Sequence, residues 1–402
     1  MQSHMKIVQI LADWKWTGPS EPVLSLSHRQ ARMGNDVTLM VRRPPADHED
    51  TESILVYARG IGPDPSRNLP ADTPLTVSTE LDLNTRTKPD NFFGVPGFIR
   101  DIRRLSRYID TNEVDVVHVH SSHDHTLAGL ARVSARRKPI IVRTDHKRNF
   151  ISRGAGNRLL LRRFTDGIIS FSHRGAKAIE TRFDFPPEHI RVIDPALELD
   201  RWNPDDGYTS MRPRFGIPGD ALVIGMVARF QKYRKTDMVI EAFAALTKDY
   251  PDARLLLLGR SSQMTESVHK PAKALGVSDR VVTPGYVMEG YRDALLSMDV
   301  FVFMMPGSDG TARALREAQV LGLPVVAIDV GMIAELVDDG RTGLLIEQTP
   351  EGLERALRRL VEDESFRKKL GETTRREALK RYDPKRQATE TLAFYTQLTG
   401  RT

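Results

Sequence analysis

The sequence predicts an α/β protein made of two doubly wound, parallel-sheet domains that face each other across a cleft. Over most of the 402 residues, short apolar runs of strand length alternate with helical patterns of apolar residues, an order typical of parallel sheets. The alternation stops over residues 194–220, where four prolines interrupt it, and then begins again. A chain of this length also exceeds the usual size of a single core, so we expect one domain on each side of this segment.

In the first half of the chain, the expected elements begin with a strand, a loop, a helix and a second strand. Residues 6–11 are apolar, residues 12–19 are rich in turn formers, and Gly34 ends the helical pattern of residues 21–33. A strand at 36–41 completes this unit of a parallel sheet. Further strands are expected at 114–119, 139–144, 167–171 and 190–193, an amphipathic helix at 97–109, and an irregular stretch at 44–75.

The second half repeats the alternation and sets the domain boundaries. Strands are expected at 222–227, 254–258, 280–283, 300–303, 324–327 and 343–345, with a helix at 235–249. A charged helical tail covers 350–398 and is broken at Pro384. We therefore expect an N-terminal domain over residues 1–200, a second domain over 201–380, and a last helix over 381–402 that packs back towards the first domain. Residues 1–4 resemble a tag remnant.

Composition excludes several classes of protein. Apolar residues make up 40% and charged residues 28% of the chain, which is ordinary for soluble globular proteins. No apolar run approaches the ~18 residues that span a membrane, and no signal peptide is visible. The chain has no cysteine, so it has neither a disulfide framework nor a thiolate metal site. These observations predict a cytoplasmic protein.

The net charge of +6 is unevenly distributed, because residues 132–163 contain eleven lysines and arginines and one acid, Asp145. Such a surface favours phosphate-bearing ligands, anionic lipid or nucleic acid, or is a solvated face with a few arginines on phosphates. Aromatic residues are sparse, at 7%, which argues against a nucleic-acid binder. The helix at 97–109, with Phe92 and Phe93 before it, leaves open a peripheral contact at the inner membrane face, against the alternative of a helix packed on the sheet.

The segment 306–318 follows an apolar strand and leads into a helix, which is where an open α/β sheet binds its ligand. Small residues at 310–312 let a ligand approach the backbone closely, and amides at a helix start suit an anion. Asp309 and Glu317 bracket this turn. They fit an acid/base pair, acceptors for sugar hydroxyls, or a helix cap beside a solvated carboxylate.

A second strand end carries cations. Arg229, Arg234 and Lys235 follow the apolar residues 222–227 and precede a helical pattern. Arginine binds phosphate oxygens through two parallel hydrogen bonds, so this loop suits a dianion. The alternative is a surface loop that is basic without binding anything.

Histidines and tryptophans supply further candidates in the first half. His118 and His120 alternate at one strand end and could bind a metal, contact a ligand or only pack. The candidate third ligands are His123, His125 and His146. Trp14 and Trp16, in the first loop, fit either a platform for a sugar acceptor or a plug that packs the loop against the sheet.

The order and spacing of these motifs resemble the retaining glycosyltransferases of family 4, which have the GT-B architecture of two Rossmann-like domains. That family shows an Arg after the first strand of its second domain, a Lys-Gly-x-Asp run, a Glu-x7-Glu segment and a Gly-x-Pro-Val-Val strand. The counterparts here are Arg229 and residues 234–237, 309–317 and 322–326, with 329–337 and 339–345 as the usual continuation. Looser matches in the first half are residues 17–18, 115–120, 144–146 and 191–195.

The resemblance implies a nucleotide-sugar site. Glu317 would accept hydrogen bonds from the ribose hydroxyls, and Arg229 with Arg234 or Lys235 would hold the diphosphate. Asp309 would accept from hydroxyls of the transferred sugar. The remaining implied contacts are the backbone amides of Gly310, Thr311 and Ala312 with the sugar, Gly18 near the phosphates, and His120 near the donor sugar.

Departures from the family pattern indicate where donor choice is encoded. Asp309 is one methylene shorter than the usual Glu, and Thr311 and Ala312 replace an aromatic residue and a Gly. Arg234 stands for the Lys of the phosphate loop and Lys235 for the following Gly. The first loop has one Gly where the family often has two.

The resemblance therefore implies a retaining hexosyltransferase that moves a sugar from a nucleotide-diphosphate sugar to a saccharide, lipid-linked or natural-product acceptor, in polysaccharide or glycoconjugate biosynthesis. No Asp-x-Asp lies at a strand end, so arginine and lysine, with no obligatory metal and no cofactor, are expected to stabilise the diphosphate. The alternatives are a nucleotide-sugar epimerase or phosphorylase-like enzyme of the same architecture, and a non-enzymatic basic protein that binds membrane surfaces. A dinucleotide oxidoreductase is disfavoured because no Gly-x-Gly-x-x-Gly follows a strand.

Overall fold

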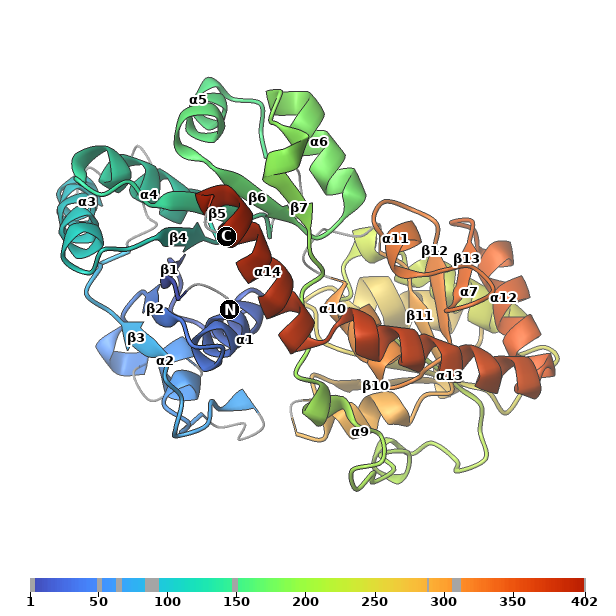
Figure 1. Ribbon diagram of the computed structural model, residues 1–402. Helices are drawn as coiled ribbons and strands as arrows, with labels where there is room; N and C mark the ends of the chain where they lie inside the picture. Colours follow the sequence, from blue (N-terminus) through green and yellow to red (C-terminus); the bar gives the residue numbers. More distant parts are fainter. Residues whose placement is uncertain are drawn as a thin grey trace. The chain divides into compact units, whose positions relative to one another are not determined.

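The computed structural model describes residues 4–48, 53–62, 67–83, 94–146, 151–287, 289–305 and 312–400. The chain divides into two compact units. Unit 1 comprises Met1–Leu197 and Asp383–Thr402, and unit 2 comprises Glu198–Tyr382. Each unit is built on one parallel sheet (Figure 1).

The sheet of unit 1 has seven strands in the order β3-β2-β1-β4-β5-β6-β7. The strands are β1 Lys6–Leu11, β2 Asp36–Val41, β3 Thr76–Ser78, β4 Val116–Val119, β5 Ile140–Thr144, β6 Gly167–Ser170 and β7 Ile190–Val192. β1 pairs with both β2 and β4, so the strand order reverses between β1 and β4. The loops that follow these two strands therefore flank a topological switch point, where open α/β sheets place ligands.

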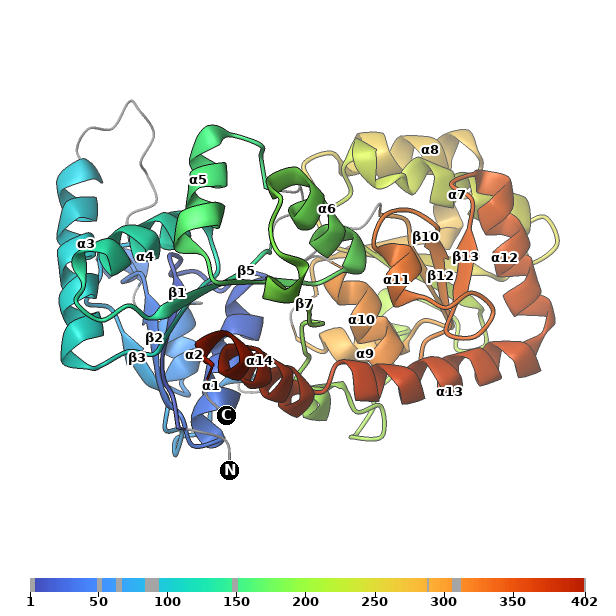
Figure 2. The same cartoon turned by 45° about the horizontal axis from the view of Figure 1, so that its top comes forward.

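Helices cover both faces of this sheet (Figure 2). One face packs against α1 and α14 and buries Ile7, Val116 and Val142, while the other packs against α3 and α4 and buries Val8 and Val117. Alternate residues of each strand thus enter different cores, as the period of two requires. The helices are α1 Ser20–Arg32, α2 Ile54–Ala58, α3 Gly94–Thr111, α4 Ser122–Ser134, α5 Ala155–Phe164, α6 His173–Phe183 and α14 Pro384–Thr399.

Unit 2 repeats this plan with six strands in the order β10-β9-β8-β11-β12-β13. The strands are β8 Val223–Val227, β9 Arg254–Leu258, β10 Val281–Gly285, β11 Val300–Phe303, β12 Val325–Ile328 and β13 Leu344–Ile346. The helices are α7 Thr236–Leu246, α8 Lys270–Ala274, α9 Tyr291–Leu296, α10 Arg313–Val320, α11 Ile333–Leu336, α12 Pro350–Glu362 and α13 Glu364–Arg381. The main core packs α7 and α12 against one face of the sheet and includes Ile224, Leu255, Phe243 and Leu357.

Two stretches differ from the sequence expectation. The stretch expected to be irregular, 44–75, contains α2, five residues long and capped by the hydroxyl of Ser53, which accepts from the amide of Val56. A helix this short shows no helical period in the sequence. The charged tail has a second break at Asp363, whose carboxylate caps α13 by accepting from the amide of Phe366 at 2.8 Å. α14 begins at Pro384, a position that suits proline.

Candidate functional site

Unit 2 places β8 and β11 side by side in its sheet. β8 pairs with β9 on one side and with β11 on the other, so the loops after β8 and β11 flank the switch point of this sheet. The loop after β11 passes through residues 306–311. Three of the candidate residues, Asp309, Gly310 and Thr311, fall in this stretch and lie outside the described residues.

The cationic loop after β8 has a defined backbone. Arg229 is exposed two residues after the end of β8, Arg234 ends a short 3-10 turn, and Lys235 precedes α7. The guanidinium of Arg234 contacts the sulfur of Met305, which ends the described part of the loop after β11. The sheet topology therefore makes neighbours of two segments that the sequence keeps far apart.

Lys235 has a left-handed backbone conformation, with φ of 58°. Glycine adopts this region without steric cost, whereas a residue with a Cβ is strained there. A Gly, which the resembling family carries after the phosphate-loop cation, would adopt this conformation without strain. In this chain the position carries a third cation instead.

Glu317 lies on α10 and is 3% exposed. Its Oε1 accepts from Nε of Arg313 at 2.6 Å, and its Oε2 accepts from the hydroxyl of Tyr291 at 3.1 Å. A carboxylate offers about four acceptor positions, so two hydrogen bonds orient this group and leave capacity for a ligand hydroxyl. Ala312, at the start of α10, is buried and gives the first-turn amides no side-chain cap.

Sequence reasoning missed the groups that surround Glu317. Burial, and then the charge of Glu317, raises the pKa of Tyr291 well above its ordinary value. Burial, and then the charge of Arg313, lowers the pKa of Arg201 to about 10. Trp202 packs edge-on against Tyr291 with ring centroids 6.0 Å apart. Of these residues, only Arg313 could have been found from the sequence. It precedes Glu317 by four positions, and residues four apart on a helix are neighbours.

An exposed aromatic–cation pair lies at the ends of β9 and β10. Tyr286 is 59% exposed, and the guanidinium of Arg260 lies 5.1 Å from the centre of its ring. Neither residue belongs to a motif that the sequence singled out. The pair offers a flat surface beside the strand that neighbours β8.

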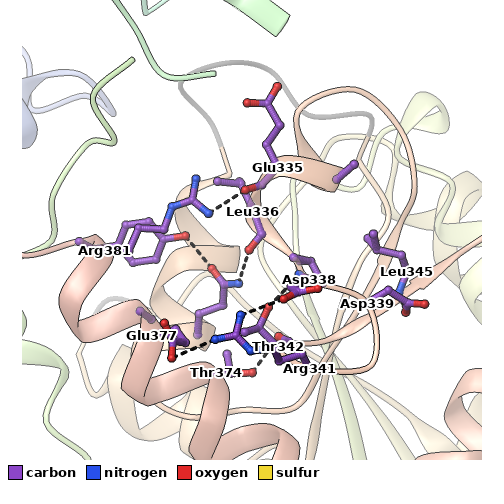
Figure 3. Close-up of a pocket in the computed structure, with 15 residues that line it drawn as sticks. Glu335, Leu336, Asp338, Asp339, Arg341, Thr342, Leu345, Thr374, Glu377 and Arg381 are labelled. Atoms are coloured by element: carbon purple, nitrogen blue, oxygen red, sulfur yellow. Dashed lines mark hydrogen bonds and ion pairs between the residues drawn. The ribbon is translucent and has the colours of Figure 1, made fainter. Parts of the chain in front are cut away.

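Part of the family-like continuation, within residues 334–345, lines a cavity of about 450 Å³ between the β12–β13 connection and α13 (Figure 3). The amide of Asp338 donates to the hydroxyl of Thr342 at 2.8 Å, and the amide of Leu345 donates to a carboxylate oxygen of Asp339 at 2.8 Å. The hydroxyl of Thr374 donates to the carbonyl of Thr342 at 2.7 Å. These contacts shape the loop that leads into β13.

In unit 1 the loop after β1 is held by its own side chains. Asp13 accepts from the amides of Trp14 and Lys15 at 2.8 and 3.1 Å. The ring of Trp14 stacks on His48 at 5.2 Å. Gly18 is exposed, and a Cβ there would meet nothing within 4 Å, so the observed backbone does not itself require glycine.

Trp16 packs its ring 4.0 Å from that of Tyr57 and lies against the core cluster that includes Ile54 and Tyr57. This packing is the arrangement expected if Trp16 holds the first loop against the sheet. Both Trp16 and Trp14 remain partly accessible.

The histidines at the strand ends are held by protein groups. His118 is buried and its ring nitrogens face Thr144 Oγ1 at 2.7 Å and Tyr395 OH at 2.5 Å. His120, 6% exposed, has its ring nitrogens opposite Gln9 Oε1 at 2.7 Å and His146 Nε2 at 3.0 Å. Within the described ranges, no group of three or more His, Asp or Glu side chains is placed to hold a metal ion.

His125, one candidate third metal ligand, is also engaged by protein. Its ring nitrogens face Thr165 Oγ1 at 2.7 Å and the guanidinium of Arg143 at 3.1 Å. Arg143 is buried and forms an ion pair with Asp145 at 3.5 Å. Burial, and then the charge of Arg143, holds the pKa of His125 well below its ordinary value.

α3 contains the amphipathic helix expected at 97–109. Its buried Leu105 and Ile109 join the core, whereas Val95 and Ile99 are 50% and 44% exposed. Phe92 and Phe93 lie outside the described residues, and the membrane contact stays a prediction. No helix in the described part of the chain has the length and apolar character needed to cross a membrane.

Known proteins resemble both halves of the chain. The family model described as "Glycosyltransferase Family 4" matches residues 17–201, and the one described as "Glycosyl transferases group 1" matches residues 208–377. A crystal structure of a glycosyltransferase from Rickettsia africae superposes with a TM-score of 0.78 at 15% identity, covering 100% of both chains. Anabaena HepE in complex with UDP superposes with a TM-score of 0.72 at 18% identity, covering 97% of this chain and 100% of that one.

Curated relatives are named D-inositol 3-phosphate glycosyltransferase. The protein from Streptomyces bingchenggensis is 30% identical over 51% of this chain and 47% of its own length, so the match spans about half of that relative. The protein from Acidothermus cellulolyticus is 25% identical over 81% of this chain and 73% of its own length. Two parallel-sheet units, the matches to both halves and the structural neighbours lead to one conclusion: the chain belongs to family 4 of the glycosyltransferases and has the GT-B fold.

Proposed function

We propose that this protein transfers a sugar, with retention of configuration, from a nucleotide-diphosphate sugar to a hydroxyl-bearing acceptor. The observation that carries the proposal is the contact between Arg234 and Met305 at the switch point of unit 2. It sets the cationic loop beside Met305, which lies twelve residues before Glu317 in the sequence. UDP and UDP-glucose are bound in the HepE neighbours, so UDP-glucose is the first donor to test.

The cationic loop after β8 and Glu317 have separate roles in the proposed reaction. Breaking the bond between sugar and phosphate leaves negative charge on the nucleotide diphosphate, and fixed cations stabilise that charge as it grows. Arg229, Arg234 and Lys235 supply such cations. Glu317, oriented by Arg313 and Tyr291, supplies the acceptor for ribose hydroxyls. Retention follows if the acceptor attacks from the face that the leaving group departs from, with a donor phosphate oxygen taking the acceptor's proton.

We propose that the hydroxyl of the acceptor belongs to a saccharide or to a compound that carries a phosphate group. The curated relatives are named for D-inositol 3-phosphate, and the excess of basic residues over 132–163 suits an anionic acceptor. An epimerase of the same architecture would consume the donor without an acceptor. Product analysis with and without D-inositol 3-phosphate therefore separates the two activities.

Replacing Glu317 tests the donor site. Glu317→Ala should weaken UDP binding about 10- to 100-fold, because hydrogen bonds to a charged acceptor contribute about 1.5–3 kcal/mol. Isothermal titration with UDP measures this, with thermal unfolding as a check that the fold survives. Glu317→Gln is the milder variant if alanine unfolds the unit. Glu351→Ala, which removes an exposed glutamate of α12, is the matched control and should bind UDP normally; unchanged affinity in both Glu317 variants would refute the ribose role.

We also propose that the reaction needs no divalent metal. The cations of the loop after β8 would take the place of a metal at the diphosphate. Treatment with EDTA should leave the initial rate of UDP release from UDP-glucose unchanged. Loss of activity that Mg²⁺ or Mn²⁺ restores would contradict this proposal while leaving the transferase assignment intact.

A further inference from the structure

A pocket of about 430 Å³ lies at the start of α7 in unit 2. The first turn of α7 and the loop before it line one side, and the π-helix η7 Thr265–His269 and the start of α8 line the other. Its volume is within the range of about 300–1,000 Å³ that is typical of small-molecule sites. Within the part of the chain that the structure describes, the pocket is not lined by any residue proposed to hold the donor, namely Arg229, Arg234, Lys235 and Glu317.

The first turn of α7 has hydrogen-bond donors without acceptors. The N-cap position is taken by Lys235, whose side chain makes no capping hydrogen bond. The backbone amides of Thr236, Asp237 and Met238 have no acceptor among the described residues, because the first amides of a helix have no partner within it. These amides, at the positive end of an eleven-residue helix, can donate to a ligand.

Thr236 is an independent indication that the pocket binds a polar compound. This residue lines the pocket and is 1% exposed. Its hydroxyl has no hydrogen-bond partner among the residues that the structure describes. Native proteins pair nearly all buried polar groups, since an unpaired one costs free energy. A ligand with a polar group at this point would pair the hydroxyl.

Carboxylates supply acceptors around the same pocket. Glu266 of η7 lines it and is held by Lys270, whose Nζ lies 2.6 Å from Oε1. Asp237 also lines it, is exposed, and has no hydrogen-bond or ion-pair partner in the described ranges. η7 is anchored by Val268, which is buried in the core of unit 2. π-Helical turns are rare and occur frequently at functional sites.

Two side-chain amides complete the polar lining. Gln231 precedes α7, and Gln263 precedes η7. Neither side chain has a hydrogen-bond partner among the described residues, and each amide can both donate and accept. The pocket therefore combines unused donors and unused acceptors within a space of small-molecule size.

This combination restricts the class of ligand. A phosphate only accepts hydrogen bonds, and it would lie against the carboxylates of Asp237 and Glu266. A cation would lie against the amides at the positive end of α7. A hydroxyl group both donates and accepts, so a compound with several hydroxyls can pair both sets. Pro271 adds an apolar surface suited to the carbon atoms of a ring.

We propose that this pocket is a binding site for a neutral saccharide or polyol, separate from the donor site. Hydroxyls of the ligand accept from the first-turn amides of α7 and from the hydroxyl of Thr236, and they donate to Asp237 and Glu266. The argument rests on unit 2 alone and needs no transfer activity, so it stands apart from the proposed function.

Methyl NMR of the full-length protein, labelled at threonine, tests the site. The probes are D-glucose, myo-inositol, inorganic phosphate and Mg²⁺, each titrated with and without saturating UDP. D-glucose or myo-inositol should shift the signals of Thr236 and Thr265 saturably in both conditions, and phosphate and Mg²⁺ should not. Saturable shifts with phosphate or Mg²⁺ alone, or with no probe, would overturn the proposal. Shifts that UDP abolishes would also overturn it, because the sugar would then occupy the donor site.

A substitution that removes only one hydroxyl tests the contact. Thr236→Val keeps the shape of the side chain, and the Kd of the bound sugar, followed at the methyl of Thr265, should rise about 3- to 10-fold, the equivalent of one hydrogen bond. Its melting temperature should not fall, because no hydrogen bond within the protein is lost. Glu266→Gln, which removes a charged acceptor at the surface, should raise the same Kd.

Thr247→Val, at the other end of α7, is the matched control. Thr247 is 5% exposed, and its hydroxyl donates to the carbonyl of Ala244 at 3.0 Å. This variant should lower the melting temperature and leave the Kd of the sugar unchanged. A Kd that is unchanged in both Thr236→Val and Glu266→Gln would place the sugar elsewhere and overturn the proposal. Absence of UDP binding would contradict the proposed function but would leave these sugar titrations decisive.

Discussion

At the residue scale, Glu317 shows what the sequence could and could not supply. Its place in the segment that matches the family's Glu-x7-Glu pattern made it a candidate, and its helix start could be predicted from the small residues before it. The sequence could not show that Tyr291, from a separate helix, would reach the same carboxylate. Such pairs depend on how α9 and α10 pack, and no local pattern reports that.

The left-handed backbone at Lys235 is strained, and substitution by glycine should remove that strain. Lys235→Gly should raise the free energy of unfolding of unit 2 by about 1 kcal/mol, because a left-handed conformation with a Cβ costs about 1–2 kcal/mol. Urea unfolding measures this. The same variant should bind UDP more weakly, since a cation is lost. Lys235→Ala should weaken UDP binding without the gain in stability, and a Gly variant no more stable than wild type would contradict the strain.

At the scale of elements, close packing at β6 helps to hold α14 on unit 1, beside hydrogen bonds such as that between Tyr395 and His118. A Cβ on Gly167, in β6, would lie 2.4 Å from a side-chain atom of Leu398 and 2.8 Å from one of Phe394. The sequence predicted the last helix and its start near Pro384. It gave no sign of this contact, because a glycine in a strand has several explanations.

Gly167→Ala should therefore destabilise unit 1 by about 1–3 kcal/mol, the usual cost of overpacking a core. The matched control is Gly156→Ala on α5, where a Cβ meets nothing within 4 Å. It should be neutral or stabilise by up to about 1 kcal/mol, since alanine is the better helix former. Equal stability of the two variants in urea would show that α14 does not pack on β6 as described.

At the scale of the whole molecule, the fold class followed from the alternation of strands and helices, and the proline-rich stretch 194–220 marked the passage between the units. What the sequence could not supply is the spatial order of strands. The pairing of β8 with β11 joins segments separated by the whole of β9 and β10. The meeting of Arg234 with Met305 at the switch point follows from that order.

Two buried histidines with lowered pKa values lie in unit 1. Acid should therefore lower the free energy of unfolding of the two units to different extents. Burial lowers the pKa of His118 to about 3 and that of His146 to about 4, both in unit 1, against about 6.5 in an unfolded chain. Below pH 6.5 the unfolded state binds more protons, so stability falls by about 1.4 kcal/mol per pH unit for each such histidine until the folded pKa is reached.

Urea unfolding from pH 7.5 to pH 4.5, with separate probes on each unit, should show unit 1 losing stability first as pH falls below 6.5. Above pH 7 its stability should not depend on these histidines. His146→Gln should reduce the slope for unit 1. A pH dependence equal in both units would contradict neutral burial of the histidines.

Unit 1 takes its last helix from beyond unit 2, and this has a consequence for biosynthesis. On the ribosome, residues 1–197 emerge without α14, so the side of their sheet that Leu392 and Tyr395 cover stays open while residues 198–382 are made. At about 5–20 residues per second this interval lasts roughly 10–40 s. During that time the nascent first unit exposes an apolar surface of the kind that chaperones bind, and His118 still lacks its contact with Tyr395.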